Sequence, residues 1–236
     1  MFVDEILLAT RDSECDYFNN GEHTLDMPLG YARMRPFGIF LGLGIERIKL
    51  GKITLFCGSS NSVRDYLLEV VAQILGAENP YYKDDKSLLC DYAKRCRVIR
   101  RTRSPFKCVY ISKQLMMDEV RNHCISDDFR QSRSMAEIYD DKIEPKALYV
   151  IEMPEAGMSV EECASVASLI YDAANYSKAQ FIISTSSPIF MGIKGAEIYD
   201  LDQRPFLPKT YYYSEARKEF SKTYDEICEL HSRKNK

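Results

Sequence analysis

The chain lacks several features that would indicate a particular class of function. Its longest apolar run is far shorter than the roughly 18 residues that span a bilayer, so we expect no membrane insertion. Its net charge of −3 excludes a protein that is basic over its whole surface, although a local basic patch is compatible with it. The first residues include acids where a signal peptide would be basic, which predicts a cytoplasmic protein.

Patterns of metal ligands are lacking as well. None of the eight cysteines belongs to a C-x-x-C pair, and the three histidines fall outside the spacing of a zinc site. Several cysteines lie within apolar strand or helix patterns, where a reduced thiol packs as a small hydrophobic group. The sequence therefore predicts a reducing compartment and no zinc.

The apolar segments that are present predict an α/β fold. Residues 147–152 and 180–185 are apolar on both faces and are separated by one amphipathic helix, which is typical of parallel strands inside a sheet. Residues 53–75 add a further strand–turn–helix unit. Ligands of such sheets bind at the carboxyl ends of the strands. We expect three turns to meet there in one cleft, those at Gly58, Glu152 and Thr185.

The division of the chain follows from the same patterns. Residues 2–11 and 37–58 have the character of strands separated by turns, so we expect residues 1–57 to form a β-rich N-terminal part. Residues 58–205 would form the core, with a mostly parallel sheet flanked by helices. Residues 206–236 would add a strand and a final helix. A single domain is predicted.

Three stretches carry a family resemblance. They read ITLFCGSSNSVRDYLLEVVA from residue 53, LYVIEMPEAGMS from residue 148, and QFIISTSSPIF followed by GAEIYDLD from residue 180. In order and spacing they resemble the ABC-type ATPases, and most closely the small stand-alone bacterial ATPases of that class. The resemblance covers nearly the whole chain. It implies a P-loop NTPase fold and suggests Mg-ATP as the ligand to test.

The phosphate loop of that family, G-x-x-x-x-G-K-[ST], corresponds here to Gly58, Ser59, Ser60, Asn61, Ser62, Val63, Arg64 and Asp65. Gly58 is kept, and Asn61 tolerates a left-handed backbone. Val63 replaces the second glycine and, being β-branched, resists positive φ. Arg64 keeps the positive charge of the lysine in a bulkier group, and Asp65 replaces the hydroxyl that binds Mg²⁺. Arg64 and Asp65 either hold nucleotide by a rearranged route or pair with each other.

The other motifs have lost their reactive groups. Glu152 follows the strand that resembles Walker B and, with Asp65, could hold Mg²⁺. Met153 occupies the position of the catalytic glutamate, and a thioether cannot accept a proton from water. Glu155 is not expected to replace that base. Ser186 stands where the family has a histidine that senses the γ-phosphate. We therefore expect no catalytic residue.

A fourth motif is altered too. Residues 131–137, QSRSMAE, lie at the distance of the family's signature segment. Gln131 and Ser132 match the small-ATPase form, whereas Arg133, Ser134 and Met135 replace the residues that would face the nucleotide of a second subunit.

Residues 94–107 hold seven basic residues and no acid, among them Arg100, Arg101 and Arg103. Such a cluster could bind nucleic acid or an acidic partner, or it could be a solvated face balanced by acids elsewhere.

Three functions are compatible with these features. The first is a degenerate ATPase homologue, a pseudoenzyme with weak or no ATP hydrolysis and no cofactor, which binds or regulates a protein partner or a second copy of itself. The second is an ATP-binding protein with low ATPase activity, in which Arg64, Asp65 and Glu152 hold Mg-ATP. The third is a nucleic-acid-binding module that uses residues 94–107.

Overall fold

The computed structural model describes residues 1–19, 36–59, 61–77, 87–126, 133–211, 217–218 and 220–226. Its strands are β1 (Val3–Leu7), β2 (Arg47–Lys49), β3 (Ile53–Cys57), β4 (Arg97–Arg100), β5 (Lys107–Ile111), β6 (Ala147–Glu152), β7 (Gln180–Ser184) and β8 (Glu197–Asp200). Its helices are α1 (Arg11–Asn19), α2 (Ile39–Gly42), α3 (Asn61–Leu75), α4 (Ser87–Arg95), α5 (Lys113–Ser126), α6 (Met135–Lys142), α7 (Val160–Tyr176) and α8 (Pro188–Met191). Among the described residues, no helix has both the length and the apolar character needed to cross a bilayer.

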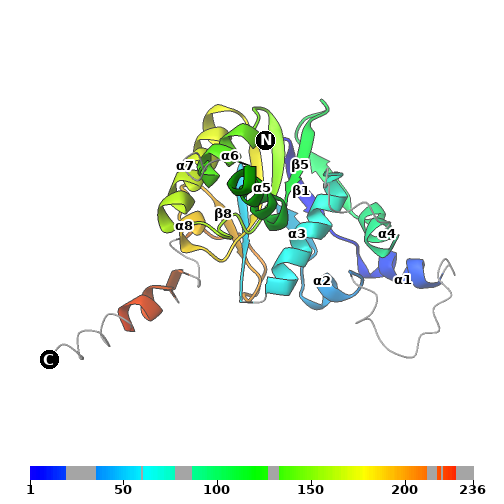
Figure 1. Ribbon diagram of the computed structural model, residues 1–236. Coiled ribbons are helices and arrows are strands. Elements are labelled where there is room, and N and C mark those ends of the chain that lie inside the picture. Colours follow the sequence, from blue (N-terminus) through cyan, green and yellow to red (C-terminus); the bar gives the residue numbers. More distant parts are fainter. Residues whose placement is uncertain are drawn as a thin grey trace.

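The strands form two sheets (Figure 1). The larger is five-stranded, in the order β5-β6-β7-β3-β8, and the smaller is three-stranded, in the order β2-β1-β4. All neighbouring pairs in the larger sheet are parallel, and those in the smaller sheet are antiparallel. The prediction of parallel strands at 147–152 and 180–185 is therefore confirmed, and the fold is α/β. Because β6, β7 and β3 are neighbours, their carboxyl ends lie side by side.

The larger sheet is covered on both faces, as its continuous apolar strands predict. Along β3, Phe56 faces one hydrophobic cluster, and Leu55 and Cys57 face another. The first cluster includes buried residues of α3, α4 and the smaller sheet. The second includes buried residues of α5, α6, α7 and α8. Alternation along each strand thus distributes its side chains between two cores.

The N-terminal part contains less β-structure than its apolar run suggests. The expectation of strand over residues 37–44 is wrong, because this segment forms a turn and the short helix α2. Gly38 has φ 76°, in the left-handed region that glycine adopts without strain. Phe37 and Phe40 are then both buried, and Phe37 stacks on Tyr17 with the ring centres 4.5 Å apart. The turn before α2 and the helix itself, not strand alternation, bring both rings against Tyr92.

The two sheets do not divide the chain at residue 57. β3 belongs to the larger sheet, whereas β4, from beyond that boundary, completes the smaller one. Of the expected final helix, residues 217–218 and 220–226 are helical and lie away from the two sheets (Figure 1). The rest of that helix lies outside the described residues. Of the expected C-terminal strand, the described residues show a bridge between Lys209 and Ile198.

Candidate functional site

The turn that resembles a phosphate loop is short. Only residues 58–60 separate β3 from α3, so the helix begins at Asn61. Asn61 does not use the left-handed backbone that it would tolerate, because this residue is helical. Val63 is helical as well and needs no positive φ, so its β-branch is not what alters the site. Ser60 lies outside the described residues, as do the side chains of Asn61 and Ser62. The motif positions from Asn61 to Asp65 are helical, so the loop itself is reduced to residues 58–60.

The beginning of this turn is bonded to the chain itself. Gly58 has φ 139°, and a Cβ placed there would lie 3.3 Å from Leu201 Cβ. The N–H of Ser59 donates to Asp202 Oδ2 at 2.5 Å. A carboxylate from the end of β8 therefore accepts the kind of backbone N–H bond that a phosphate would accept in a working loop.

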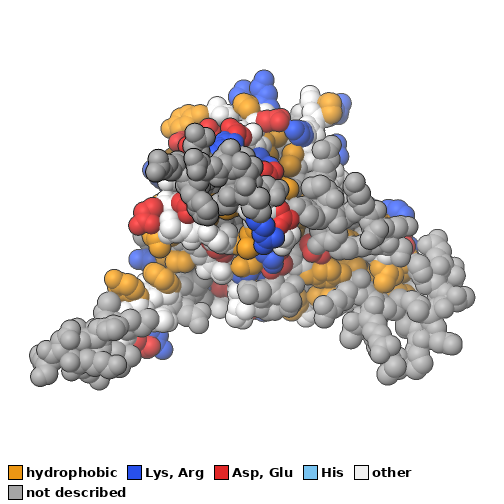
Figure 2. Space-filling model, in the orientation of Figure 1, with side chains coloured by type: hydrophobic (Ala, Val, Ile, Leu, Met, Phe, Trp, Pro, Cys, Tyr) orange, Lys and Arg blue, Asp and Glu red, His pale blue; other side chains and the backbone are white. Residues whose placement is uncertain are grey.

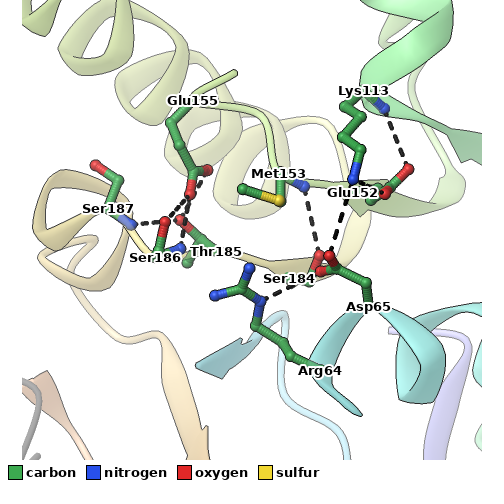
Figure 3. A network of polar contacts seen from close by, with 10 residues as sticks. All are labelled: Arg64, Asp65, Lys113, Glu152, Met153, Glu155, Ser184, Thr185, Ser186 and Ser187. Atoms are coloured by element: carbon green, nitrogen blue, oxygen red, sulfur yellow. Dashed lines mark hydrogen bonds and ion pairs between the residues drawn. The ribbon is translucent and has the colours of Figure 1, made fainter. Parts of the chain in front are cut away.

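Arg64 points into the protein. Its side chain is completely buried, and its Nε donates to Asp65 Oδ1 at 3.2 Å (Figure 3). The sequence left open whether Arg64 and Asp65 hold a nucleotide or pair with each other, and in the structure they form an ion pair. The positive charge at the position of the phosphate-binding lysine is held between α3 and the sheet, where it is not exposed to solvent.

Lys113 joins Asp65 and Glu152, the two carboxylates that the sequence offered as possible Mg²⁺ ligands. Its Nζ lies 2.9 Å from Glu152 Oε1 and 3.9 Å from Asp65 Oδ2 (Figure 3). Its backbone N–H also donates to Glu152 Oε2 at 3.4 Å. The hydrogen bond to Glu152 and the surrounding negative charge raise the pKa of Lys113, so the ammonium stays charged. The sequence analysis did not identify Lys113. Its position just after β5 could have indicated it, because the carboxyl ends of the parallel strands lie at this edge.

The residues as they lie do not fit a magnesium nucleotide. Mg²⁺ demands near-octahedral oxygen coordination, usually with one or two carboxylates, waters and phosphate oxygens. Here an ammonium group lies between the two carboxylates. In the part of the chain that the structure describes, no group of three or more His, Cys, Asp or Glu side chains could hold a metal. Asp65 and Glu152 are ion-pair partners of Lys113 in this arrangement.

Met153 stands at the end of β6 in a strained conformation. Its φ is 43°, which costs a non-glycine residue about 1–2 kcal/mol. Its N–H donates to the Ser184 carbonyl at 2.9 Å, which joins the end of β6 to the end of β7 (Figure 3). The turn after β7 is joined to β3 in the same way, since Thr185 N–H donates to the Phe56 carbonyl at 3.0 Å. The turns at Gly58, Glu152 and Thr185 therefore lie side by side at one edge of the sheet, which is the neighbour relationship that the sequence predicted.

Glu155 binds the turn that follows β7. Its Oε2 accepts from Thr185 Oγ1 at 2.9 Å, and its Oε1 accepts from the N–H and the hydroxyl of Ser186 at 2.6 Å and 2.9 Å. Ser186, which stands at the position of the sensing histidine, is thus bonded to Glu155 (Figure 3). Both carboxylate oxygens of Glu155 are engaged, so it does not present a free base to water.

The residues expected in the signature segment serve α6. Ser134 is the N-cap of this helix and forms a capping box with Glu137. Arg133 donates to the Glu137 carbonyl and forms an ion pair with Asp141. Met135 is buried. Gln131 and Ser132 lie outside the described residues.

Most of the basic segment is engaged in internal contacts. Arg101 pairs with Asp4 at 2.9 Å, and Arg100 lies over the ring of Phe106. Three further basic residues of residues 94–107 have partners: Lys94 with Asp91, Arg95 with the Tyr17 ring and Lys107 with Glu144. Arg103 is exposed. Among the side chains visible in Figure 2, basic and acidic groups are interspersed. These contacts favour the interpretation of a balanced, solvated face.

The comparisons with known proteins add no family. No family model matches the chain, and no curated protein matches it. The class that the structure defines is an α/β protein with a five-stranded parallel sheet flanked by helices. Its candidate site is the edge where β3, β6 and β7 end.

Proposed function

We propose that this protein is a degenerate homologue of the ABC-type ATPases that acts by binding a partner and does not hydrolyse ATP. One observation carries the proposal: the side chains at the key motif positions are bonded to one another. These pairs are Arg64 with Asp65, Glu152 with Lys113, and Ser186 with Glu155. Among the described side chains at these positions, none is left to hold a phosphate or to accept a proton from water.

Electrostatics also oppose the binding of a triphosphate at this edge. Three carboxylates, those of Asp65, Glu152 and Asp202, lie at the turns where phosphates would be held. Each like-charge pair at about 4 Å costs on the order of 4 kcal/mol at an effective dielectric constant of about 20, before screening. A ligand would also have to separate the Lys113–Glu152 pair. The contacts at this edge therefore stabilise the fold and make the binding of a nucleotide unfavourable.

An ATPase-like domain that has lost its catalytic residues can still bind another protein. The family that the sequence resembles works through head-to-tail pairs of domains. A second copy of this chain, or a relative with intact motifs, is accordingly the partner that we propose.

Calorimetry with Mg-ATP and Mg-ADP tests the proposal. We expect no heat of binding, no thermal shift and no phosphate release from the full chain. Binding that is lost in Asp65→Ala and in Glu152→Gln would instead support the rearranged ATP site. Binding that is unchanged in both variants would place nucleotide elsewhere. Turnover that disappears in Asp65→Ala would overturn the proposal.

A further inference from the structure

A cavity of about 680 Å³ lies at the other end of the larger sheet, away from the turns discussed above. Ile53 and Glu197, the first residues of β3 and β8, line it, so it opens at the amino ends of these strands. Asp4 and Ile99 line it from the smaller sheet. Its volume lies within the range of about 300–1,000 Å³ that is usual for small-molecule sites.

Two buried polar side chains fix the wall of this cavity. Gln180 accepts bonds from the N–H groups of Phe2 and Val3, and it donates to the carbonyls of Val3 and Gly51 at 2.8 Å and 3.0 Å. The hydroxyl of Tyr199 accepts from the N–H of Lys49 and donates to its carbonyl. The segment from Lys49 to Gly51 is therefore held from the larger sheet at both ends, so the cavity is preformed.

The charged groups of the cavity are complementary to a ligand with charges of both signs. Glu197 is half-buried, and a Cβ added at Gly51 would lie only 3.0 Å from its Cδ. Burial raises the pKa of Glu197, and the positive charge of Lys49 offsets this rise in part. Lys49 and Lys194 also line the cavity. Within the described part of the chain, the charged groups of Glu197, Lys49 and Lys194 have no hydrogen-bond or ion-pair partner, whereas Lys52 Nζ donates to Asn175 Oδ1 at 3.0 Å.

We propose that this cavity binds a small zwitterion of the amino-acid or short-peptide class. Its carboxylate would lie against the ammonium groups of Lys49 and Lys194, and its ammonium group would donate to Glu197. A simple anion would satisfy the lysines and leave the partly buried carboxylate without a donor, which is unfavourable. A simple cation would leave the lysines unpaired. The site does not depend on the proposed loss of ATPase activity.

Calorimetry with the full chain and four probes tests this site: triglycine, N-acetyl-triglycine, triglycine amide and inorganic phosphate. We expect triglycine to bind, and each blocked peptide and phosphate to bind at least tenfold more weakly. In Glu197→Gln, triglycine should bind no better than the acetylated peptide. In Lys194→Gln, which leaves Lys49 in place, the preference for triglycine over the amide should fall. Lys107→Gln, which changes a lysine of the Glu144 ion pair, is the matched control and should change none of these affinities.

Three results would overturn the inference. They are the absence of binding by any peptide, equal binding of free and blocked peptides, and binding of phosphate as tight as that of triglycine. If either cavity variant fails to fold, the comparison of the four probes on the unaltered chain still decides between a zwitterion site and a simple anion site.

Discussion

Lys113 determines the electrostatics of the edge where β3, β6 and β7 end. Its ammonium lies between Asp65 and Glu152, in the region where an ATPase of the proposed ancestry would hold its metal. A single positive charge offsets part of the repulsion between two carboxylates. It cannot coordinate a phosphate and a water together, as a divalent ion does. Lys113 thus stabilises the two carboxylates by its charge alone.

Replacing Lys113 with methionine should lower the free energy of unfolding by roughly 1 kcal/mol. The figure is modest because the Lys113 side chain is 43% exposed and solvent screens its ion pairs. Urea denaturation measures the change. Lys107→Met, which removes a lysine from a pair with an exposed Glu144, is the control and should cost only a few tenths of a kcal/mol. Equal effects of the two variants would show that Lys113 has no special role.

Glu14 gives a pH dependence whose sign can be stated. The carboxyl is buried, and its Oε2 accepts from the Gly38 N–H at 2.9 Å. Burial raises the pKa of Glu14 above its ordinary value of 4.5. The folded state therefore binds the proton more tightly than the unfolded state does, and this stabilisation is lost as the pH rises through the folded value.

Glu14→Gln keeps an oxygen acceptor for Gly38 and removes the charge. Relative to the wild type, the variant should gain stability as the pH rises from about 4 to 7, because it has no buried carboxylate to ionise. Chemical denaturation across this range measures the difference. The surface variant Asp12→Asn is the control. If the difference in stability between the variant and the wild type does not vary with pH, the pKa of Glu14 is not raised in the folded state.

Glu155 shows how one side chain fixes an element boundary. It binds Thr185 and Ser186 at the end of β7 from the turn after β6. Glu155→Gln replaces a charged acceptor with a weaker neutral one. We expect the amide of Ser186 to exchange its hydrogen about tenfold faster, with little change in the core of β7. Glu161→Gln, at an exposed position of α7, is the control. Unchanged exchange at Ser186 would mean that backbone geometry alone holds this turn.

The sequence was sufficient for some elements and insufficient for others. Strands β3, β6 and β7 follow from continuous apolar runs, since few other structures bury every residue. The segment from Phe37 to Leu43 has a similar composition, but contacts with distant Tyr17 and Tyr92 decide its conformation. The order of apolar residues within this segment carries no information about contacts with residues so distant in the sequence.

The same limit applies to the candidate site. The ends of the strands predicted where Arg64 and Glu152 would lie. They did not reveal that Lys113, from a different strand end, would lie between two carboxylates. They also did not reveal that Asp202 would bind the N–H of Ser59. Partner choice among charged side chains depends on the packed geometry, because long side chains reach several neighbours at similar cost.

The whole molecule depends on how its two sheets are joined, and Gln180 is the main polar link between them. This fully buried side chain bonds Phe2, Val3 and Gly51, which lead into β1 and β3. Leucine has a similar size but satisfies none of these backbone groups, and each buried group left unpaired costs about 1–3 kcal/mol. Some of these groups will find water, so the total should be smaller than the sum.

Gln180→Leu should therefore lower the free energy of unfolding by roughly 3 kcal/mol, measured by urea denaturation, and hydrogen exchange of the β1 amides should accelerate more than that of the β7 amides. Gln114→Leu is the control, because Gln114 bonds only Asp118 on the surface of α5 and should change stability by a few tenths of a kcal/mol. A loss below about 1 kcal/mol at Gln180 would mean that apolar contacts and the hydrogen bonds between Tyr199 and Lys49 are sufficient to join the two sheets. The wall of the proposed zwitterion cavity would then be less rigid than its hydrogen bonds indicate.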